Sequence, residues 1–159
     1  MTADILIQQA HTKDAPAIAV LVGELLAEIM NAIDTRAFNF NLQETTARLE
    51  AYLANGTYVV FVARPAHSDP VGFVALCECH ALYAEGAFGT IPELYVRPAY
   101  RTRSLGMRLV SEARAYGTAR GWKRLEVTTP PLPQFDRTLA FYEREGFSVA
   151  GGRKLRMLL

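Results

Sequence analysis

This 159-residue sequence contains few cysteines and no excess of charge of either sign. Its only cysteines, Cys77 and Cys79, lack the C-x₂-C spacing and the second cysteine pair that are typical of zinc sites. The neighbouring His80 leaves a metal site as an alternative. Two reduced cysteines on one face of a strand explain the pattern better. We therefore expect no bound metal.

The charge balance and the lack of long apolar runs argue against several kinds of partner. Seventeen basic and sixteen acidic residues leave a formal charge of +1, which creates no global field to attract nucleic acid or an anionic membrane. No apolar run approaches the length of a membrane-spanning helix, and residues 1–10 lack the basic and apolar regions of a signal peptide. We expect a cytoplasmic protein that binds neither nucleic acid nor a membrane.

The composition is that of an ordinary soluble protein, with 50% apolar and 21% charged residues. The length suits one domain, residues 1–159, with a core of its own. Apolar spacing and turn signals predict helices at 16–29, 42–53, 105–120 and 136–145. β-branched and aromatic residues, alternation and the Gly151-Gly152 turn predict strands at 5–9, 57–63, 71–79, 93–96, 125–127, 147–149 and 154–158. Residues 31–40 and 80–89 are predicted loops.

The most informative segment is residues 91–107, IPELYVRPAYRTRSLGM. Residues 94–96 are β-formers, Pro98 ends the strand because it lacks an N–H donor, and an apolar helical pattern starts at Leu105. The first N–H groups of such a helix have no partner and point outward at the positive end of the helix dipole. A phosphate fits there, flanked by the guanidinium groups of the intervening loop. The alternative is a loop that binds nothing, because the segment matches neither a P-loop nor G-x-G-x-x-G.

Three segments together resemble the GNAT superfamily of N-acetyltransferases. They are ELYVRPAYR at 93–101, R-x-x-S-x-G at 101–106 and LAFYEREGF at 139–147. The family signature is Q/R-x-x-G-x-G/A, followed by a Y-x-x-x-G-F ending, which begins here at Tyr142. The specific match covers residues 91–147, and residues 1–90 agree only in the order of the elements.

The resemblance implies an α/β (α+β) fold in a single domain. Its central mixed, mostly antiparallel sheet has about six to seven strands, is splayed at the middle and is flanked by about four helices. The resemblance also implies acetyl-CoA as co-substrate, with the pyrophosphate against the backbone of 101–107 and the pantetheine arm paired with the 94–96 strand. The residues implied to bind the cofactor are Leu94, Tyr95, Val96, Arg101, Thr102, Arg103, Ser104, Leu105, Gly106, Met107, Asp136 and Tyr142.

The sequence departs from the family pattern at two places. Ser104 stands where the family usually has glycine. A positive φ at Ser104 would cost about 1–2 kcal/mol, whereas a role as helix N-cap would suit serine well, and we favour the N-cap. The asparagine often found near the start of the last helix is missing, and Phe135 and Asp136 occupy that region.

Acetyl transfer to an amine needs a base, a donor for the oxyanion and a proton for the leaving thiolate. Glu93, on the splayed strand, is the candidate base, acting through water, and its alternative role is an ion pair at a strand end. Tyr142 matches the family's tyrosine and is the candidate acid, since a phenol with a pKa near 10 is protonated at neutral pH. Its alternative role is packing of the last helix onto the sheet. The expected oxyanion donor is the backbone N–H of Tyr95 or Val96.

We expect the protein to transfer acetyl from acetyl-CoA to a primary amine of a small molecule or to an exposed protein amino group. The alternatives are a non-catalytic coenzyme A sensor on the same fold and an unrelated phosphate-binding module. The resemblance is compatible with a homodimer. In this fold the acceptor pocket is formed by segments that correspond to 30–40 and 80–89. Their aromatic and acidic residues suit a cation with an apolar part: Asp34, Phe38, Phe40, Tyr83, Glu85 and Phe88.

Overall fold

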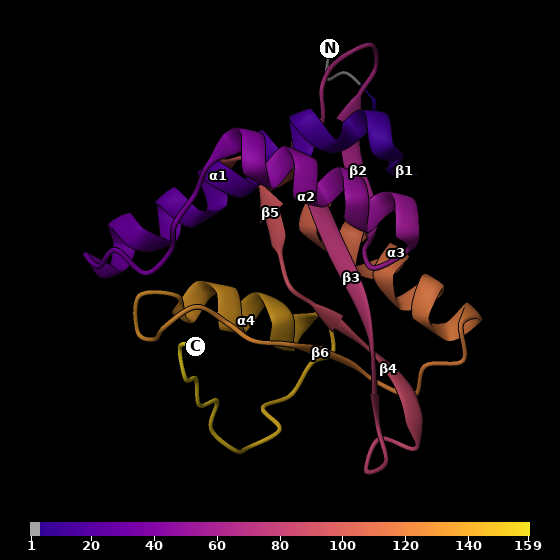
Figure 1. Ribbon diagram of the computed structural model, residues 1–159, viewed down its shortest axis with the longest axis vertical. Coiled ribbons are helices and arrows are strands. Elements are labelled where there is room, and N and C mark those ends of the chain that lie inside the picture. Colours follow the sequence, from indigo (N-terminus) through magenta and orange to yellow (C-terminus); the bar gives the residue numbers. More distant parts are fainter. Residues whose placement is uncertain (1–3) are drawn as a thin grey trace. The chain divides into compact units, whose positions relative to one another are not determined.

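The computed structural model describes residues 4–159, and the chain divides into two compact units, Met1–Thr128 and Thr129–Leu159. The second unit contains one helix, α4 (Asp136–Arg144). The first unit contains all the strands (Figure 1). Its elements are β1 (Ile5–Gln9), the 3-10 turn η1 (Thr12–Asp14), α1 (Ala15–Ile33), α2 (Leu42–Asn55), β2 (Val59–Pro65), β3 (Gly72–Ala81), β4 (Gly86–Ile91), β5 (Leu94–Val96), the 3-10 helix η2 (Pro98–Arg103), α3 (Leu105–Ala119) and β6 (Leu125–Val127).

Helices cover both faces of the sheet in the first unit (Figure 1). Side chains alternate between the faces of a strand. Val60 and Val62 of β2 therefore pack in a buried cluster with Ile18 of α1 and Leu49 of α2. Phe61, between the two valines, points to the other face and meets Tyr116 of α3 at 6.0 Å between ring centroids. Because both faces are buried, the central strands are almost continuously apolar.

The sheet is splayed beside β3. The strand order is β1-β2-β3-β4-β6, with antiparallel pairs except for the parallel pair of β4 and β6, and β5 pairs with β3. Cys77 lies opposite Thr90 on β4, and Val74 lies opposite Leu94 on β5. From Cys77 to Val74 is three residues along β3, whereas from Thr90 to Leu94 is four residues along the segment that pairs with it. The segment that joins β4 and β5 therefore contains a one-residue bulge. This confirms the splayed, mostly antiparallel sheet predicted from the sequence.

Two parts of the predicted strand pattern are wrong. Residues 86–91 form β4, although 86–89 were predicted as part of a loop. The strand was not predicted because β4 contains glycines, and glycine has a low strand propensity. Gly89 is required because a Cβ there would lie 2.2 Å from the ring of Trp122. At the other end of the chain, residues 147–149 and 154–158 are not strands, and the described part of the chain has no strand after β6.

Helix ends follow the capping signals in the sequence. The Asn41 side chain accepts a hydrogen bond of 2.9 Å from the backbone N–H of Glu44 at the start of α2. Gly56 ends α2 with φ 78°, a left-handed conformation that favours glycine. The first helix is longer than predicted. Residues Thr12–Ile33 are long and apolar enough to span a membrane by length and composition, contrary to our expectation. In this fold Ile18 and Leu21 of α1 are fully buried core residues.

Candidate functional site

The splayed edge of β5 leaves backbone groups without a strand partner. Ala75 N–H donates to Glu93 O at 2.9 Å, and Arg97 N–H donates to Val71 O at 2.9 Å. Because hydrogen-bonded residues alternate in an antiparallel ladder, the backbone groups of Tyr95 face β3 and those of Leu94 and Val96 face the free edge. Among the described strands none pairs with this edge. Of the two expected oxyanion donors, Val96 therefore has the outward N–H.

The segment after β5 presents unpaired donors at the start of α3. Arg108 N–H donates to Ser104 O at 3.1 Å, and this is the first helical hydrogen bond of α3. The N–H groups of Leu105, Gly106 and Met107 precede it and have no acceptor within the helix. Ser104 itself has φ 58° and ψ 22°, and its side chain makes no capping hydrogen bond. The favoured N-cap role of Ser104 is therefore wrong, and the strained alternative is the one observed.

This strain leads to a stability prediction. Ser104→Gly should stabilise the protein by about 0.5–1 kcal/mol, because glycine avoids the left-handed penalty while losing some chain entropy. The melting temperature without cofactor should rise by about 1–4 °C. Ser104→Ala is the matched control: it keeps the penalty and removes a hydroxyl that caps nothing, so its melting temperature should stay close to that of the wild type. A clear loss of stability in Ser104→Ala would restore the capping role.

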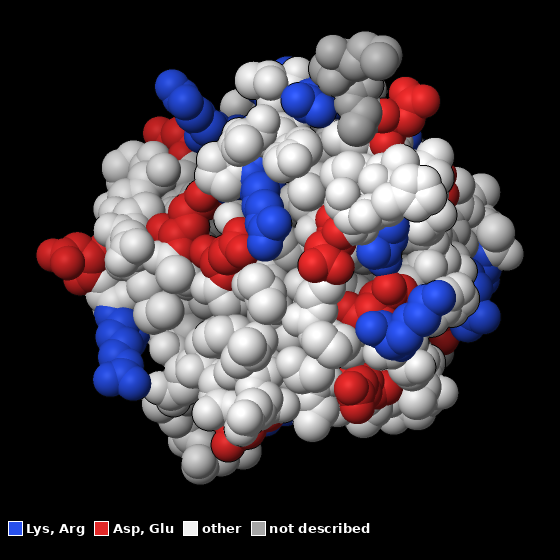
Figure 2. All heavy atoms as spheres, turned by 90° about the horizontal axis from the view of Figure 1, so that it is seen from above, with Lys and Arg blue, Asp and Glu red and all other residues white. Residues whose placement is uncertain are grey.

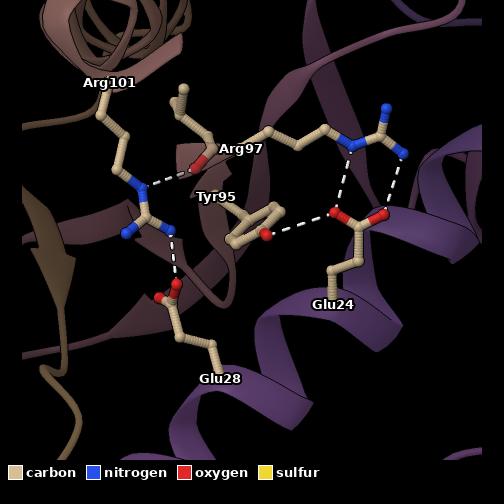
Figure 3. A network of polar contacts seen from close by, with 6 residues as sticks. Glu24, Glu28, Tyr95, Arg97 and Arg101 are labelled. Carbon is tan, nitrogen blue, oxygen red and sulfur yellow. Dashed lines mark hydrogen bonds and ion pairs between the residues drawn. The ribbon is translucent and has the colours of Figure 1, made fainter. Parts of the chain in front are cut away.

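Two arginines around the site are held by acids of α1 (Figure 3). Arg97 donates to Glu24 through Nε at 3.1 Å and Nη2 at 2.8 Å, and Tyr95 Oη donates to the same carboxylate at 3.2 Å. Burial, together with the charge of Glu24, raises the pKa of Tyr95 to about 12, so this phenol remains a donor. These bonds fix β5 against α1.

The arginines of η2 differ in their partners. Arg101 donates through Nη2 to Glu28 at 2.7 Å and through Nε to Val96 O at 2.8 Å, the outward carbonyl of β5 (Figure 3). Arg103 lies over the ring of Tyr100 at 5.1 Å, and no carboxylate of the described residues lies within ion-pair distance of it. Arg103 is therefore the arginine that can reach a phosphate as the structure stands.

A pocket of about 250 Å³ lies between α1, α2 and the sheet. Its floor is apolar and buried, and is formed by Ile18, Val60, Phe73 and Ala75. Exposed residues form its rim: Asn39, Phe40 and Arg48. Of the two segments expected to form an acceptor pocket, 30–40 contributes Asn39 and Phe40, and 80–89 contributes no lining residue.

The position of Phe40 depends on a glycine in α1. A Cβ at Gly23 would come within 2.6 Å of the Phe40 ring, so the missing side chain leaves room for it. Asp34, Phe38, Tyr83, Glu85 and Phe88 do not line the pocket, contrary to the expectation for their two segments. Tyr83 and Phe88 instead lie near each other in the β3–β4 hairpin, with ring centroids 6.5 Å apart.

Glu93 is the single carboxylate among the pocket residues. Tyr58 Oη lies 3.0 Å from its Oε2 and 3.2 Å from its Oε1. Burial raises the pKa of Glu93, and the hydrogen bond from Tyr58 partly opposes this. Burial and the Glu93 charge in turn raise the pKa of Tyr58, which stays a donor. Glu93 therefore pairs with a phenol and not with an arginine, which makes it available to accept a proton.

Sequence reasoning missed Tyr58 and Arg48. Tyr58 is 35 residues from Glu93 and comes close to it only through the register of β2, β3 and β5. One signal existed, since Tyr58, Val60 and Val62 alternate along the chain and so share the face that packs on α1 and α2. No comparable signal pointed to Arg48, because an exposed helical arginine is common.

The second unit holds the two remaining predicted site residues. Tyr142 is buried against Phe141 and Phe147, at 5.2 and 5.4 Å between ring centroids. Burial raises its pKa to about 12. Asp136 is the first residue of α4, and Phe135 precedes it as a cap without a side-chain hydrogen bond. Tyr142 thus packs among aromatic residues of its own unit, and both its packing of α4 onto the sheet and its catalytic role stay predictions.

The described residues contain no group of three or more His, Cys, Asp or Glu side chains that could hold a metal ion. Cys77 and Cys79 are free thiols on β3. Three cations near the β3–β4 hairpin and β6 are paired with carboxylates: Arg120 with Glu78, Lys123 with Glu85 and Arg124 with Glu126. Figure 2 shows acidic and basic side chains interspersed on one face, with no large patch of one sign.

Comparison with known proteins defines the family. A family model for the acetyltransferase (GNAT) domain matches residues 54–149. YhfO of Bacillus subtilis (strain 168), an uncharacterised N-acetyltransferase, is 31% identical over 146 residues, which cover 92% of this chain and 91% of that protein. The chain therefore belongs to the GNAT acetyltransferase family.

Solved structures share the fold at low sequence identity. An aminoglycoside acetyltransferase from an uncultured soil metagenomic sample, in complex with sisomicin, has a TM-score of 0.76 and 17% identity, covering 98% of this chain and 96% of that chain. The ribosomal-protein-alanine N-acetyltransferase of Brucella melitensis biovar Abortus 2308 has a TM-score of 0.72 and 19% identity, covering 98% and 100%. These likenesses extend over nearly the whole chain and concern the fold.

Proposed function

We propose that the protein is an acetyl-CoA-dependent N-acetyltransferase that acts on a primary amine bound in the pocket between α1 and α2. The observation that carries this proposal is the position of Glu93. Its carboxylate lines an apolar pocket, pairs with a phenol and directly precedes the free edge of β5. A base is thus held where an amine can enter from the pocket and an acyl donor can lie along the strand.

The backbone of the first unit suits the two ends of acetyl-CoA. The outward N–H and C=O groups of Leu94 and Val96 can pair with the amides of the pantetheine arm. The N–H groups of Leu105 to Met107 can donate hydrogen bonds to the pyrophosphate, with Arg103 adding positive charge. Val96 O is bonded to Arg101, so pairing at that carbonyl requires the Arg101 side chain to move. Bound acetyl-CoA would supply the thioester.

The chemistry assigned to this chain is proton removal and charge stabilisation. Glu93 accepts a proton from the bound ammonium group, directly or through water, and its raised pKa makes it a stronger base than an exposed carboxylate. The outward N–H of Val96 or Leu94 donates to the negative charge that develops on the acetyl oxygen. The apolar pocket excludes water and strengthens these electrostatic interactions.

Tyr142 is proposed as the donor to the departing sulfur, on the basis of its place in the Y-x-x-x-G-F ending. With a pKa of about 12 the phenol is protonated at every practical pH, so it acts by donating a hydrogen bond. Tyr142→Phe should lower turnover by about 10²–10⁴-fold while acetyl-CoA affinity barely changes. Single-turnover kinetics and a binding titration measure the two quantities. Nearly full turnover in Tyr142→Phe would leave only the packing role.

Thiol release from acetyl-CoA on addition of an amine tests the proposed function directly. An enzyme releases free thiol in proportion to acetylated amine, detected by a thiol reagent and by mass spectrometry. A coenzyme A sensor on the same fold would show a melting temperature raised by acetyl-CoA without turnover. An unrelated phosphate-binding module would show neither response to acetyl-CoA, and would refute the donor assignment.

The remaining proposals concern the setting of the reaction. We propose that residues 1–159 act as one acetyltransferase domain, since the family match at 54–149 spans the boundary between the units. We place the enzyme in the cytoplasm, where its two free thiols would stay reduced. Acceptors with a protein amino group and a homodimeric assembly remain within the proposal. Size-exclusion chromatography with light scattering measures the assembly.

A further inference from the structure

The pocket carries opposite charges at its two ends. Glu93 lines its inner part, next to the buried floor residues Phe73 and Ala75. Arg48 of α2 is exposed and forms part of the rim. Between them the lining is apolar or aromatic, apart from the phenol groups of Tyr52 and Tyr58 and the neutral side chains of Asn39 and Thr45. A ligand that fills this pocket therefore meets a carboxylate at depth and a guanidinium at the mouth.

Arg48 has no carboxylate partner among the described residues, unlike Arg97 and Arg101. Arg97 and Arg101 are paired with Glu24 and Glu28. Glu44 lies one turn before Arg48 on α2, a spacing that favours an ion pair, yet no described carboxylate lies within 4.0 Å of Arg48. The guanidinium lines the pocket instead, where it can meet an anionic group of a ligand.

The volume limits the size of such a ligand. The pocket has a volume of about 250 Å³. Drug-sized ligands occupy larger pockets, of about 300–1,000 Å³. A polycationic sugar would also bring several ammonium groups to a site with one carboxylate and a facing arginine. The pocket favours a short, straight acceptor with one positive end.

On the basis of the proposed function, we propose that the acceptor is a short primary amine with an apolar body and an anionic group, such as a carboxylate, at the end remote from the amine. The amine lies at Glu93, the apolar body lies against the floor, and Arg48 donates charge-assisted hydrogen bonds to the anion. Arg48 is thus a specificity-determining residue, and Glu93 is a catalytic one.

Three amines of equal chain length test this inference: 5-aminopentanoate, pentylamine and cadaverine, with anionic, neutral and cationic far ends. The wild type should turn over 5-aminopentanoate with a kcat/KM at least about tenfold above that for pentylamine, and cadaverine should be the poorest. Arg48→Gln should lose the preference for the carboxylate, and Arg48→Glu should favour cadaverine. Pentylamine should be affected little by Arg48→Gln, because it has no group for Arg48.

Lys13→Gln is the matched control, since it removes one exposed positive charge of η1 that does not line this pocket, and it should keep the wild-type order. Melting temperatures of all variants, with and without acetyl-CoA, verify that folding and donor binding are intact. Turnover of the amines without a preference for the carboxylate, or a preference unchanged in both Arg48 variants, would overturn this inference and leave the proposed function standing. If none of the three amines is acetylated while acetyl-CoA binds, the inference fails. The proposed function fails as well only if a wider set of amines and peptides also releases no thiol from acetyl-CoA.

Discussion

Glu93→Gln is expected to lower the rate of acetyl transfer by about 10²–10⁴-fold at neutral pH, the usual contribution of a positioned base. The substitution keeps the shape of the side chain and an oxygen that can accept from Tyr58. The deficit should shrink at high pH, where free amine is abundant, and the acidic limb of the pH profile of kcat/KM should flatten. A small loss of rate that is the same at every pH would make Glu93 structural.

Tyr58→Phe is the companion experiment. It removes the hydroxyl that lowers the pKa of Glu93 and leaves the burial that raises it. The acidic limb should therefore move to higher pH while the enzyme remains active. If the acidic limb stays at the same pH as in the wild type, a group other than Glu93 determines the position of that limb.

The same carboxylate also affects stability. The pKa of Glu93 is raised in the folded state, so binding of a proton to Glu93 favours folding. This stabilisation is fully present at a pH below the unfolded pKa and is lost as the pH rises through the folded pKa. At neutral pH the ionised group thus opposes folding. Glu93→Gln should melt at a higher temperature than the wild type at neutral pH, with a smaller difference in acid. A lower rate together with a higher melting temperature would mark a group kept for function.

Gly106→Glu is expected to remove most of the affinity for acetyl-CoA, by about 10²-fold or more. The new side chain stands at the second residue of α3, where it blocks the backbone and repels the pyrophosphate at a few ångströms. A carboxylate in the first turn of a helix is favourable to the fold by about 0.3–1 kcal/mol. Cofactor binding and stability should therefore change in opposite directions, which thermal shift with and without acetyl-CoA measures in one experiment.

Gly106→Ala separates bulk from charge. A methyl group adds little volume and no charge, so its loss of affinity should be much smaller than that of Gly106→Glu. Equal and large losses in both variants would indicate that close backbone approach alone decides binding. Wild-type affinity in a folded Gly106→Glu protein would remove the start of α3 from the cofactor site.

Periodic segments of the fold could be predicted from the sequence, and segments defined by their neighbours could not. Apolar residues recur at helical spacing in α1 and α2, and short apolar runs bounded by turn signals mark β2 and β3. In contrast, β4 contains Gly89, whose presence is explained by Trp122, a residue 33 positions further along the chain. The Gly151-Gly152 turn predicted a strand at 154–158, yet Leu155 and Met157 are exposed, because a turn signal alone supplies no hydrophobic face and no pairing partner.

The candidate site shows the same division. Glu93 and residues 101–107 could be found because strand, loop and helix follow one another in the sequence. The pocket could not, because Arg48 and Tyr58 come from other parts of the chain and line the same pocket as Glu93 only in the folded protein. The left-handed backbone of Ser104 also escaped prediction, since serine is a favourable residue at an ordinary N-cap.

The bulge between β4 and β5 has a consequence for which changes of chain length this protein can tolerate. If the ladder of β4 continued without the extra residue, Glu93 would lie opposite Val74, a fully buried residue whose side chain points away from the pocket. The bulge absorbs one residue, and Glu93 lies opposite Ala75, on the pocket face. A further single-residue insertion or deletion between Ile91 and Leu94 would turn the carboxylate into the core unless the ladder absorbed it. The length of this short segment is therefore as tightly constrained as the identity of Glu93 itself.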